Sequence, residues 1–171
     1  MNKQSSLWLV VMVVVAAVSA LLTRHFAAAE LRHARIDEGL APVVALLKDN
    51  QKILASLEAE GYPKNESALL ERYLSDIRRD GVPKYAATGK RIATLVDNDT
   101  VIVALLANQS ENLRSVDLKV QAEKYREFAA ALRNRWQSTF ETFMAGGSLP
   151  AAGPERPDGI LAAVEGEIAA Q

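Results

Sequence analysis

Apolar residues dominate positions 7–22, and no charged residue interrupts this run. A straight helix of this length rises roughly 24 Å, slightly short of a ~30 Å hydrocarbon core. Trp8 near its start is typical of a residue at a membrane interface. Lys3 alone precedes the run as a basic side chain, and small residues that suit signal-peptide cleavage stand at positions 18–20 and 27–29. The run therefore fits a retained membrane anchor or a cleaved signal peptide.

An apolar stripe continues beyond this run in alternating steps of four and three residues. From Leu22 it passes through Phe26, Ala29, His33, Ile36, Leu40, Val43, Leu47, Asn50, Leu54 and Leu57. Such a heptad repeat is typical of a helix that packs along one side against other helices. We expect one long helix over residues 5–60, kinked where Gly39 and Pro42 interrupt it. The unbroken phase favours a retained anchor, in which we place Leu7, Trp8, Val14, Leu21 and Leu22.

Breaks in the pattern predict further helices after residue 60. Gly61 and Pro63 end the first helix, and Asn65 is a good cap for a second helix that reaches about residue 80. Its apolar face contains Leu69, Leu70, Tyr73, Leu74 and Ile77. Residues 81–83 break this helix, and Pro83 suits the first turn of a third.

Residues 91–106 allow two interpretations. Two β-branched runs around Asp97, Asn98 and Asp99 are compatible with a β-hairpin. No other segment supplies a third strand, and an isolated hairpin is only marginally stable. The apolar positions also form a helical stripe, so we favour one helix, or two helices joined at residues 97–100.

The last long helix is predicted from about Ser110 to Met144. Its recurring apolar positions, which we expect in the core of a bundle, are Leu113, Val116, Val120, Tyr125, Phe128, Leu132, Trp136, Phe140 and Phe143. Gly146 and Gly147 end it. Residues 146–159, GGSLPAAGPERPDG, have the composition of a flexible linker, and residues 160–171 could form a short, weak helix.

These elements predict an all-α protein. A transmembrane helix in residues 1–24 continues into an antiparallel, coiled-coil-like bundle of three to four helices in residues 25–145. A flexible linker with a short helix, residues 146–171, completes the chain. Short loops between helices favour antiparallel neighbours.

Composition and the remaining motifs narrow the chemistry. The chain has 20 basic and 21 acidic residues, a near balance that argues against a nucleic-acid partner. It has no cysteine, which excludes disulfides and thiolate metal sites. His25 and His33 are separated by about 80° on a helix and form no paired metal site. The DNDT sequence at 97–100 lacks the following oxygen ligand and glycine of a calcium loop. We therefore expect no metal and no cofactor.

No nucleophile–base pair or phosphate-binding loop is visible, so we do not expect an enzyme. The expected function is that of a single-pass, membrane-anchored scaffold or accessory subunit of a bacterial envelope complex. Protein partners, or further copies of the chain, would bind the helix faces at 36–57 and 113–143. The seam at Ile36, Leu40, Val43, Leu47, Asn50, Leu54 and Leu57 is the first of these faces. Asn50 would fix register or partner number there, or face solvent.

The alternative is a periplasmic helical bundle that binds a small ligand or lipid, tethered or released by cleavage. A pocket lined by Tyr125, Phe128 and Trp136 would favour this role. For either role we expect the bacterial inner membrane as location and the periplasm as the side of the bundle. The orientation stays open, because Arg24, Arg32 and Arg35 outweigh Lys3 in the count of basic residues on the two sides of the run.

Overall fold

The computed structural model of the chain describes residues 36–147 and 153–170. The apolar run lies outside these residues, with its anchor positions Leu7, Trp8, Val14, Leu21 and Leu22. The first part of the seam and the side chain of Ile36 also lie outside them. No helix in the described residues is long and apolar enough to cross a membrane. The anchor therefore stays a prediction.

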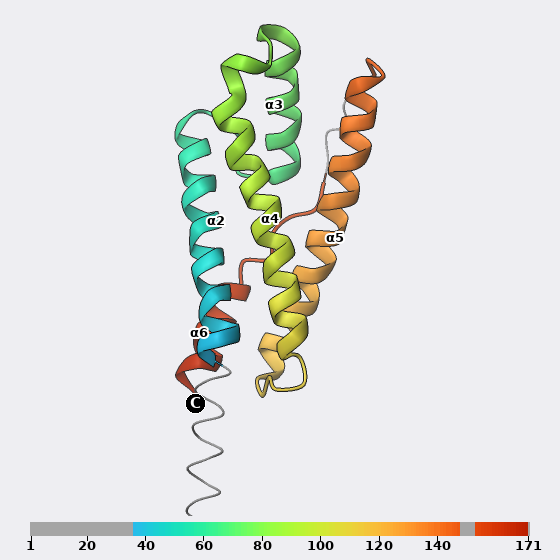
Figure 1. Cartoon of the computed structure of the whole chain (residues 1–171). Coiled ribbons are helices and arrows are strands. Elements are labelled where there is room, and N and C mark those ends of the chain that lie inside the picture. Colours follow the sequence, from blue (N-terminus) through green and yellow to red (C-terminus); the bar gives the residue numbers. More distant parts are fainter. Residues whose placement is uncertain (1–35, 148–152, 171) are drawn as a thin grey trace, which may run out of the picture. The chain divides into compact units, whose positions relative to one another are not determined.

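Residues that the structure describes form helices and turns and contain no strand, which confirms the predicted all-α bundle. A π-helical turn, Ile36–Leu40, leads into α2 (Ala41–Ala59), which is followed by α3 (Glu66–Asp80) and a short 3-10 helix (Val82–Tyr85). The remaining helices are α4 (Ala86–Gln109), α5 (Val116–Met144) and α6 (Ile160–Ala169). Helix α4 packs between α2 and α5 and runs antiparallel to both (Figure 1). Helix α3 contacts α5 and α4, and α6 contacts α5 and α2.

The turn between α2 and α3 has the predicted signals. Gly61 has a φ of +87°, in the left-handed region that glycine adopts without strain. Two backbone hydrogen bonds around it form a Schellman motif, which ends α2. The Asn65 side chain accepts hydrogen bonds from the backbone N–H groups of Ser67 and Ala68, both at 3.1 Å, and so caps α3. This cap places Glu66 at the first position of α3.

Helix α4 continues without a break through residues 97–100, so the hairpin interpretation is wrong and the proposed joint is absent. The polar residues that resembled a turn are instead part of the buried face. Asn98 is 9% exposed and Asp99 is 3% exposed, between the apolar Leu95 and Ile102. Their side chains find hydrogen-bond partners on other helices, so they do not need to bond to nearby backbone in a turn.

The seam of α2 faces the interior of the bundle. Its buried members are Leu40, Val43, Leu47, Asn50 and Leu57, and Leu54 is half-buried. Asn50 is 1% exposed, so it does not face solvent. Leu57 joins Tyr62, Leu69, Ile92 and Leu95 in a cluster against which Trp136 of α5 packs.

Along α5, some of the predicted core positions are buried and others are not. Tyr125, Phe128 and Leu132 of α5 are buried, and so is Leu113 in the connection before the helix. Val116, Val120 and Phe140 are 76%, 46% and 55% exposed, so their assignment to the core is wrong. The buried face repeats every seven residues through Leu118, Tyr125, Leu132 and Thr139. At 100° per residue, the two valines lie on nearly the opposite side from Leu118 and Phe140 lies about 100° from Thr139.

Helix α6 is part of the bundle. It buries Ile160, Ala163 and Val164. Both carboxylate oxygens of its Glu167 accept hydrogen bonds from the backbone, from Arg114 N–H at 3.0 Å and Ser115 N–H at 2.8 Å. These N–H groups precede α5, where a negative charge is favoured by the helix dipole.

The segment before α6 also lies directly on the bundle. A Cβ on Gly153 would stand 1.7 Å from Ser67 Oγ in the first turn of α3, so only glycine lets the backbone pass so closely. The described residues from Gly39 onward form one compact unit. The predicted flexible linker is therefore wrong for residues 153–159, whereas the short C-terminal helix predicted in residues 160–171 is present as α6. Linker composition was misleading because two charged side chains, the half-buried Arg156 and the buried Glu167, bind other parts of the bundle.

Candidate functional site

Arg156, from the segment that had been assigned to a linker, reaches into the centre of the bundle. Its Nε donates a hydrogen bond to Glu66 Oε1 at 2.8 Å, and its Nη2 donates to Asp99 Oδ2 at 2.8 Å. Its Nη1 donates to the Tyr125 hydroxyl. The Arg156 side chain is 17% exposed, and those of Glu66 and Asp99 are each 4% exposed. Two buried carboxylates from α3 and α4 thus share one guanidinium.

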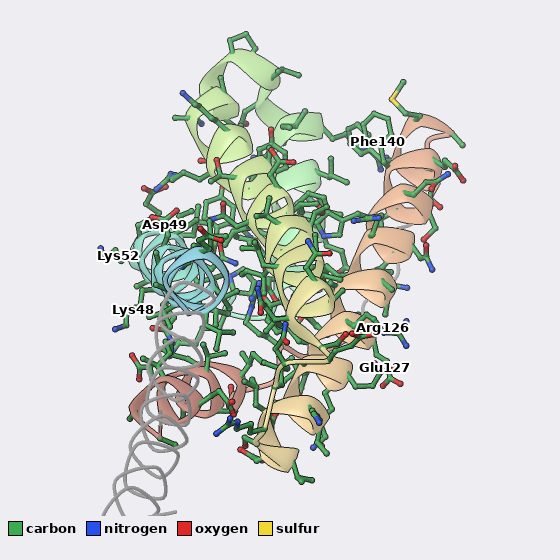
Figure 2. The ribbon with its side chains drawn as sticks, turned by 60° about the horizontal axis from the view of Figure 1, so that its bottom comes forward. Lys48, Asp49, Lys52, Arg126, Glu127 and Phe140 are labelled. Atoms are coloured by element: carbon green, nitrogen blue, oxygen red, sulfur yellow. The ribbon has the colours of Figure 1, made fainter. Side chains whose placement is uncertain are left out.

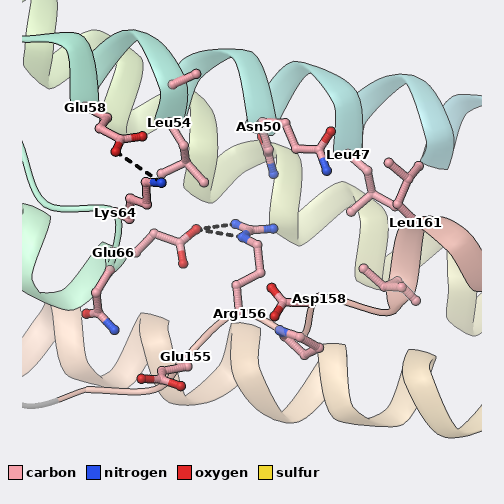
Figure 3. A pocket seen from close by; sticks show the side chains of 15 residues that line it. Leu47, Asn50, Leu54, Glu58, Lys64, Glu66, Glu155, Arg156, Asp158 and Leu161 are labelled. Carbon is pink, nitrogen blue, oxygen red and sulfur yellow. Dashed lines mark hydrogen bonds and ion pairs between the residues drawn. The ribbon is translucent and has the colours of Figure 1, made fainter.

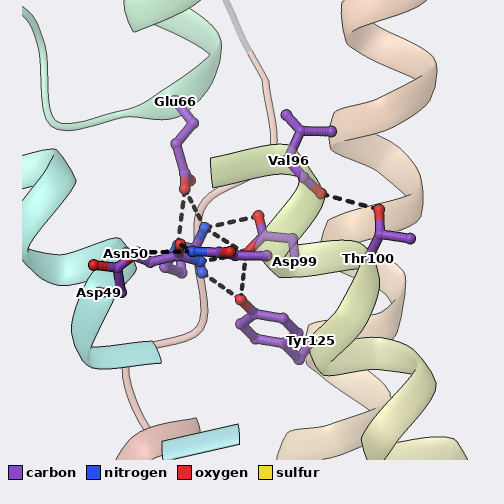
Figure 4. A network of polar contacts seen from close by, with 9 residues as sticks. Asp49, Asn50, Glu66, Val96, Asp99, Thr100 and Tyr125 are labelled. Atoms are coloured by element: carbon purple, nitrogen blue, oxygen red, sulfur yellow. Dashed lines mark hydrogen bonds and ion pairs between the residues drawn. The ribbon is translucent and has the colours of Figure 1, made fainter. Parts of the chain in front are cut away.

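Further hydrogen bonds extend this ionic centre to α2 and α5 (Figure 4). Asp99 Oδ1 accepts from the Tyr125 hydroxyl at 2.5 Å and from Asn50 Nδ2 at 2.7 Å. Asn50 Oδ1 in turn accepts from Asn98 Nδ2 at 2.8 Å. Burial raises the pKa of Tyr125, so its hydroxyl keeps the proton that it donates. We call Asn50, Glu66, Asn98, Asp99, Tyr125 and Arg156 the buried network; it connects four helices and the C-terminal segment.

Aromatic rings complete the surroundings of the guanidinium. The Arg156 guanidinium carbon lies 5.0 Å from the centre of the Phe128 ring and 5.4 Å from that of Tyr125. Both distances allow cation–π attraction. Tyr125 and Phe128 are thus core residues, as the sequence predicts. Their rings also contact the Arg156 guanidinium of the C-terminal segment.

A pocket of about 480 Å³ opens beside the buried network (Figure 3). Its wall combines α2, the start of α3 and residues 155–161. Leu47, Leu54, Ile160 and Leu161 supply the apolar part. This volume is typical of small-molecule sites, and the apolar side chains share the wall with several polar and charged groups.

The charged side chains on the pocket wall are mostly acidic. They are Glu58, Lys64, Glu66, Glu155, Arg156 and Asp158, which give a net charge of −2 when all are ionised. Both basic groups are already in ion pairs: Lys64 Nζ lies 3.1 Å from Glu58 Oε1, and Arg156 pairs with Glu66. The pocket therefore offers unneutralised negative charge.

The predicted ligand-binding aromatics do not line this pocket. Tyr125 is fully buried, and Trp136 packs against the apolar cluster around Leu57. Phe128 borders a separate, open depression on the α5 side of residues 154–159. A pocket exists beside Arg156, but not among the three aromatic residues where we expected one.

Sequence reasoning missed Glu66, Asp99 and Arg156, the charged centre of the site. Two signals were available: Asn50 interrupts an apolar seam, and Asn98 and Asp99 interrupt the apolar stripe of α4. Polar residues at such positions indicate buried polar contacts. Nothing in the sequence around Arg156, which lies between two prolines, indicates that it is their partner.

Comparisons with protein-family models, curated proteins and solved structures find no match. Within residues 36–147 and 153–170, no group of three or more His, Asp or Glu side chains is placed to hold a metal ion.

Glu66 gives the stability a predictable dependence on pH. Burial raises the pKa of Glu66 above 4.5, and the neighbouring Arg156 offsets this only in part. Above about pH 4.5 the folded state therefore holds this proton more tightly than the unfolded chain, so the Glu66 contribution to stability falls as pH rises through the folded pKa. Glutamine has no carboxyl proton to lose, so we expect the free energy of unfolding of the Glu66→Gln variant to lack this pH-dependent contribution. Relative to the variant, the wild type should lose stability as pH increases, measured by urea unfolding at several pH values. A stability difference that is constant over the whole range would contradict the raised pKa.

Proposed function

We propose that the protein is a non-enzymatic binding module whose helical bundle holds a small organic molecule in the pocket between α2, α3 and residues 155–161. Residues 7–22 would tether it to a bacterial inner membrane, with the bundle in the periplasm. The observation that supports binding is the 480 Å³ pocket with an apolar wall and charged groups at its inner end.

The buried network supports this proposal because it makes the pocket rigid. Glu66 and Arg156 line the pocket and are held by contacts on their inner side, so little side-chain freedom remains to be lost when a ligand binds. Residues 155–161 complete the pocket wall only while Arg156 is bound to Glu66 and Asp99. Pocket formation is thereby linked to docking of the C-terminal segment.

The competing proposal, a scaffold or accessory subunit, depends on helix faces that partners can reach. The seam of α2 is directed into the chain's own bundle, where Leu47 and Leu57 are 4% and 0% exposed. In the second expected face, residues 113–143, Tyr125, Phe128 and Leu132 are likewise buried, whereas Val116, Val120 and Phe140 stay exposed. We therefore give the binding role priority over the scaffold role.

Filling the pocket tests the proposed function. We expect full-length protein purified from native membranes to carry a bound organic molecule, detected by mass spectrometry after denaturation. Leu54→Trp places an indole at the pocket wall and should abolish this co-purification. Lys52→Trp is the matched control, because Lys52 is exposed on the same helix and does not line the pocket (Figure 2).

Two outcomes would count against the binding role. In the first, no small molecule is found while a stoichiometric protein partner co-purifies, which favours the scaffold role. In the second, Leu54→Trp and Lys52→Trp both retain the molecule, which places it outside this pocket.

A further inference from the structure

One oxygen of a buried carboxylate at the pocket has no partner. Arg156 donates its hydrogen bonds to Glu66 through Oε1 alone. The hydrogen bonds of Glu66 with Arg156 leave Oε2 unused, and no dashed line reaches that oxygen from the side chains drawn in Figure 3. The Glu66 side chain is only 4% exposed, yet it lines the pocket. Glu66 Oε2 is not among the buried atoms that lack a hydrogen bond, so it is accessible and free to accept a hydrogen bond from a ligand in the pocket.

The surroundings of Glu66 select the charge of that donor. Lys64 and Arg156, the two cations on the wall, are already in ion pairs, and the wall keeps a net charge of −2. An anionic ligand would find no free cation among these residues. A cationic donor would instead form a charge-assisted hydrogen bond with Oε2, in a partly desolvated place where such bonds are strong.

The apolar side chains of the pocket wall indicate that the remainder of the ligand is a hydrocarbon. Leu47 and Leu54 of α2 line the pocket together with Ile160 and Leu161 of the C-terminal segment. These side chains offer an apolar surface next to the charged end. The complementary molecule has one ammonium group and a hydrocarbon body.

We propose that the pocket binds a small amphipathic amine, with its ammonium group on Glu66 Oε2 and its hydrocarbon body between Leu54 and Leu161. This inference rests on the proposed function, because it names the ligand class of the same pocket. The amine can be a soluble molecule or the headgroup of an aminolipid, since both present the same ammonium chemistry.

The test compares three molecules of nearly equal shape on the full-length chain in lipid nanodiscs. The probes are 2-phenylethylamine, 2-phenylethanol and 3-phenylpropanoate, and binding is measured by isothermal titration calorimetry against empty nanodiscs. We expect the amine to bind about 10- to 100-fold more tightly than the alcohol, the gain of a hydrogen bond to a charged group. The carboxylate should bind most weakly. To distinguish the two sources, nanodiscs with and without an ethanolamine lipid are compared; competition by that lipid identifies the headgroup as the natural ligand.

Two variants locate the effect at Glu66. Glu66→Gln keeps an oxygen for Arg156 but replaces the free carboxylate, so amine affinity should fall about tenfold or more while alcohol affinity stays similar. Glu155→Gln is the matched control: Glu155 lines the same pocket but is exposed, and its replacement should change amine affinity less than threefold or so. Circular dichroism establishes that each variant is folded. If Glu66→Gln does not fold, Leu54→Trp serves instead and should abolish amine binding.

The outcomes separate the two proposals. Equal affinity for all three probes, lost in Leu54→Trp, keeps the binding pocket and overturns the amine assignment. Preference for the carboxylate, or amine binding that Glu66→Gln leaves unchanged, also overturns the amine assignment alone. Failure of all three probes to bind at millimolar concentration, together with no co-purifying molecule, overturns both.

Discussion

Replacing Arg156 with methionine is expected to lower the free energy of unfolding by about 3–5 kcal/mol, because it leaves two buried carboxylates without their cation. Glu66 and Asp99 are each 4% exposed and share this guanidinium. The deficit should grow as pH rises through the raised pKa of Glu66, since that carboxylate then becomes ionised without its cation. We expect a melting temperature at least about 10 °C lower. Urea unfolding followed by circular dichroism measures the loss.

Arg126→Met is the matched control for this experiment. Arg126 also forms an ion pair, with Glu123, but its side chain is 61% exposed on the outer face of α5 (Figure 2). Exposed pairs contribute little, so this variant should lose no more than about 1 kcal/mol. Equal losses in the two variants would show that Arg156 is not seated between Glu66 and Asp99, and that residues 155–161 do not form the pocket wall.

Leu47→Asp is expected to have the second large effect, at least about 4 kcal/mol, because it removes a buried apolar side chain and buries a charge in its place. Leu47 is 4% exposed on the buried seam of α2. Loss of helicity by circular dichroism, or a steep fall in urea stability, measures the effect.

Leu54→Asp tests a less buried position of the same seam. Leu54 is half-buried and borders the pocket, where water can reach a carboxylate. Its replacement should therefore cost about half as much as that of Leu47. Full helicity and unchanged stability in Leu47→Asp would mean that the seam is not buried.

Local signals along the chain were sufficient for most helix ends. Gly61, Asn65 and Gly81 act within a few residues of their own positions, so their role as terminators or caps can be identified without tertiary information. Helical periodicity was sufficient to predict a helix at α4, although Asp97, Asn98 and Asp99 resemble a turn. It was less reliable in α5, because steps of three to five residues also admit exposed positions such as Val116 and Val120.

The site itself was not predictable, because its members come from five separate segments. Asn50, Glu66, Asp99, Tyr125 and Arg156 meet only when α2, α3, α4, α5 and the C-terminal segment are packed together. Hydrophobic periodicity reports which face of a helix is buried, but it does not report which polar groups meet across that interface. Arg156 lies in a proline- and glycine-rich stretch, where a charged residue carries no periodic signal.

By itself, the amino-acid sequence determined the all-α class, the order of the helices and the burial of the seam from Leu40 to Leu57, because these depend on short-range periodicity and capping. Only the tertiary structure decided that residues 153–170 dock on the bundle, that Arg156 joins Glu66 and Asp99, and that a pocket with an unpartnered carboxylate oxygen lies beside them. The physical reason is that a buried charge is tolerated only with its partner, and here the partners lie 57 and 90 residues apart in the chain.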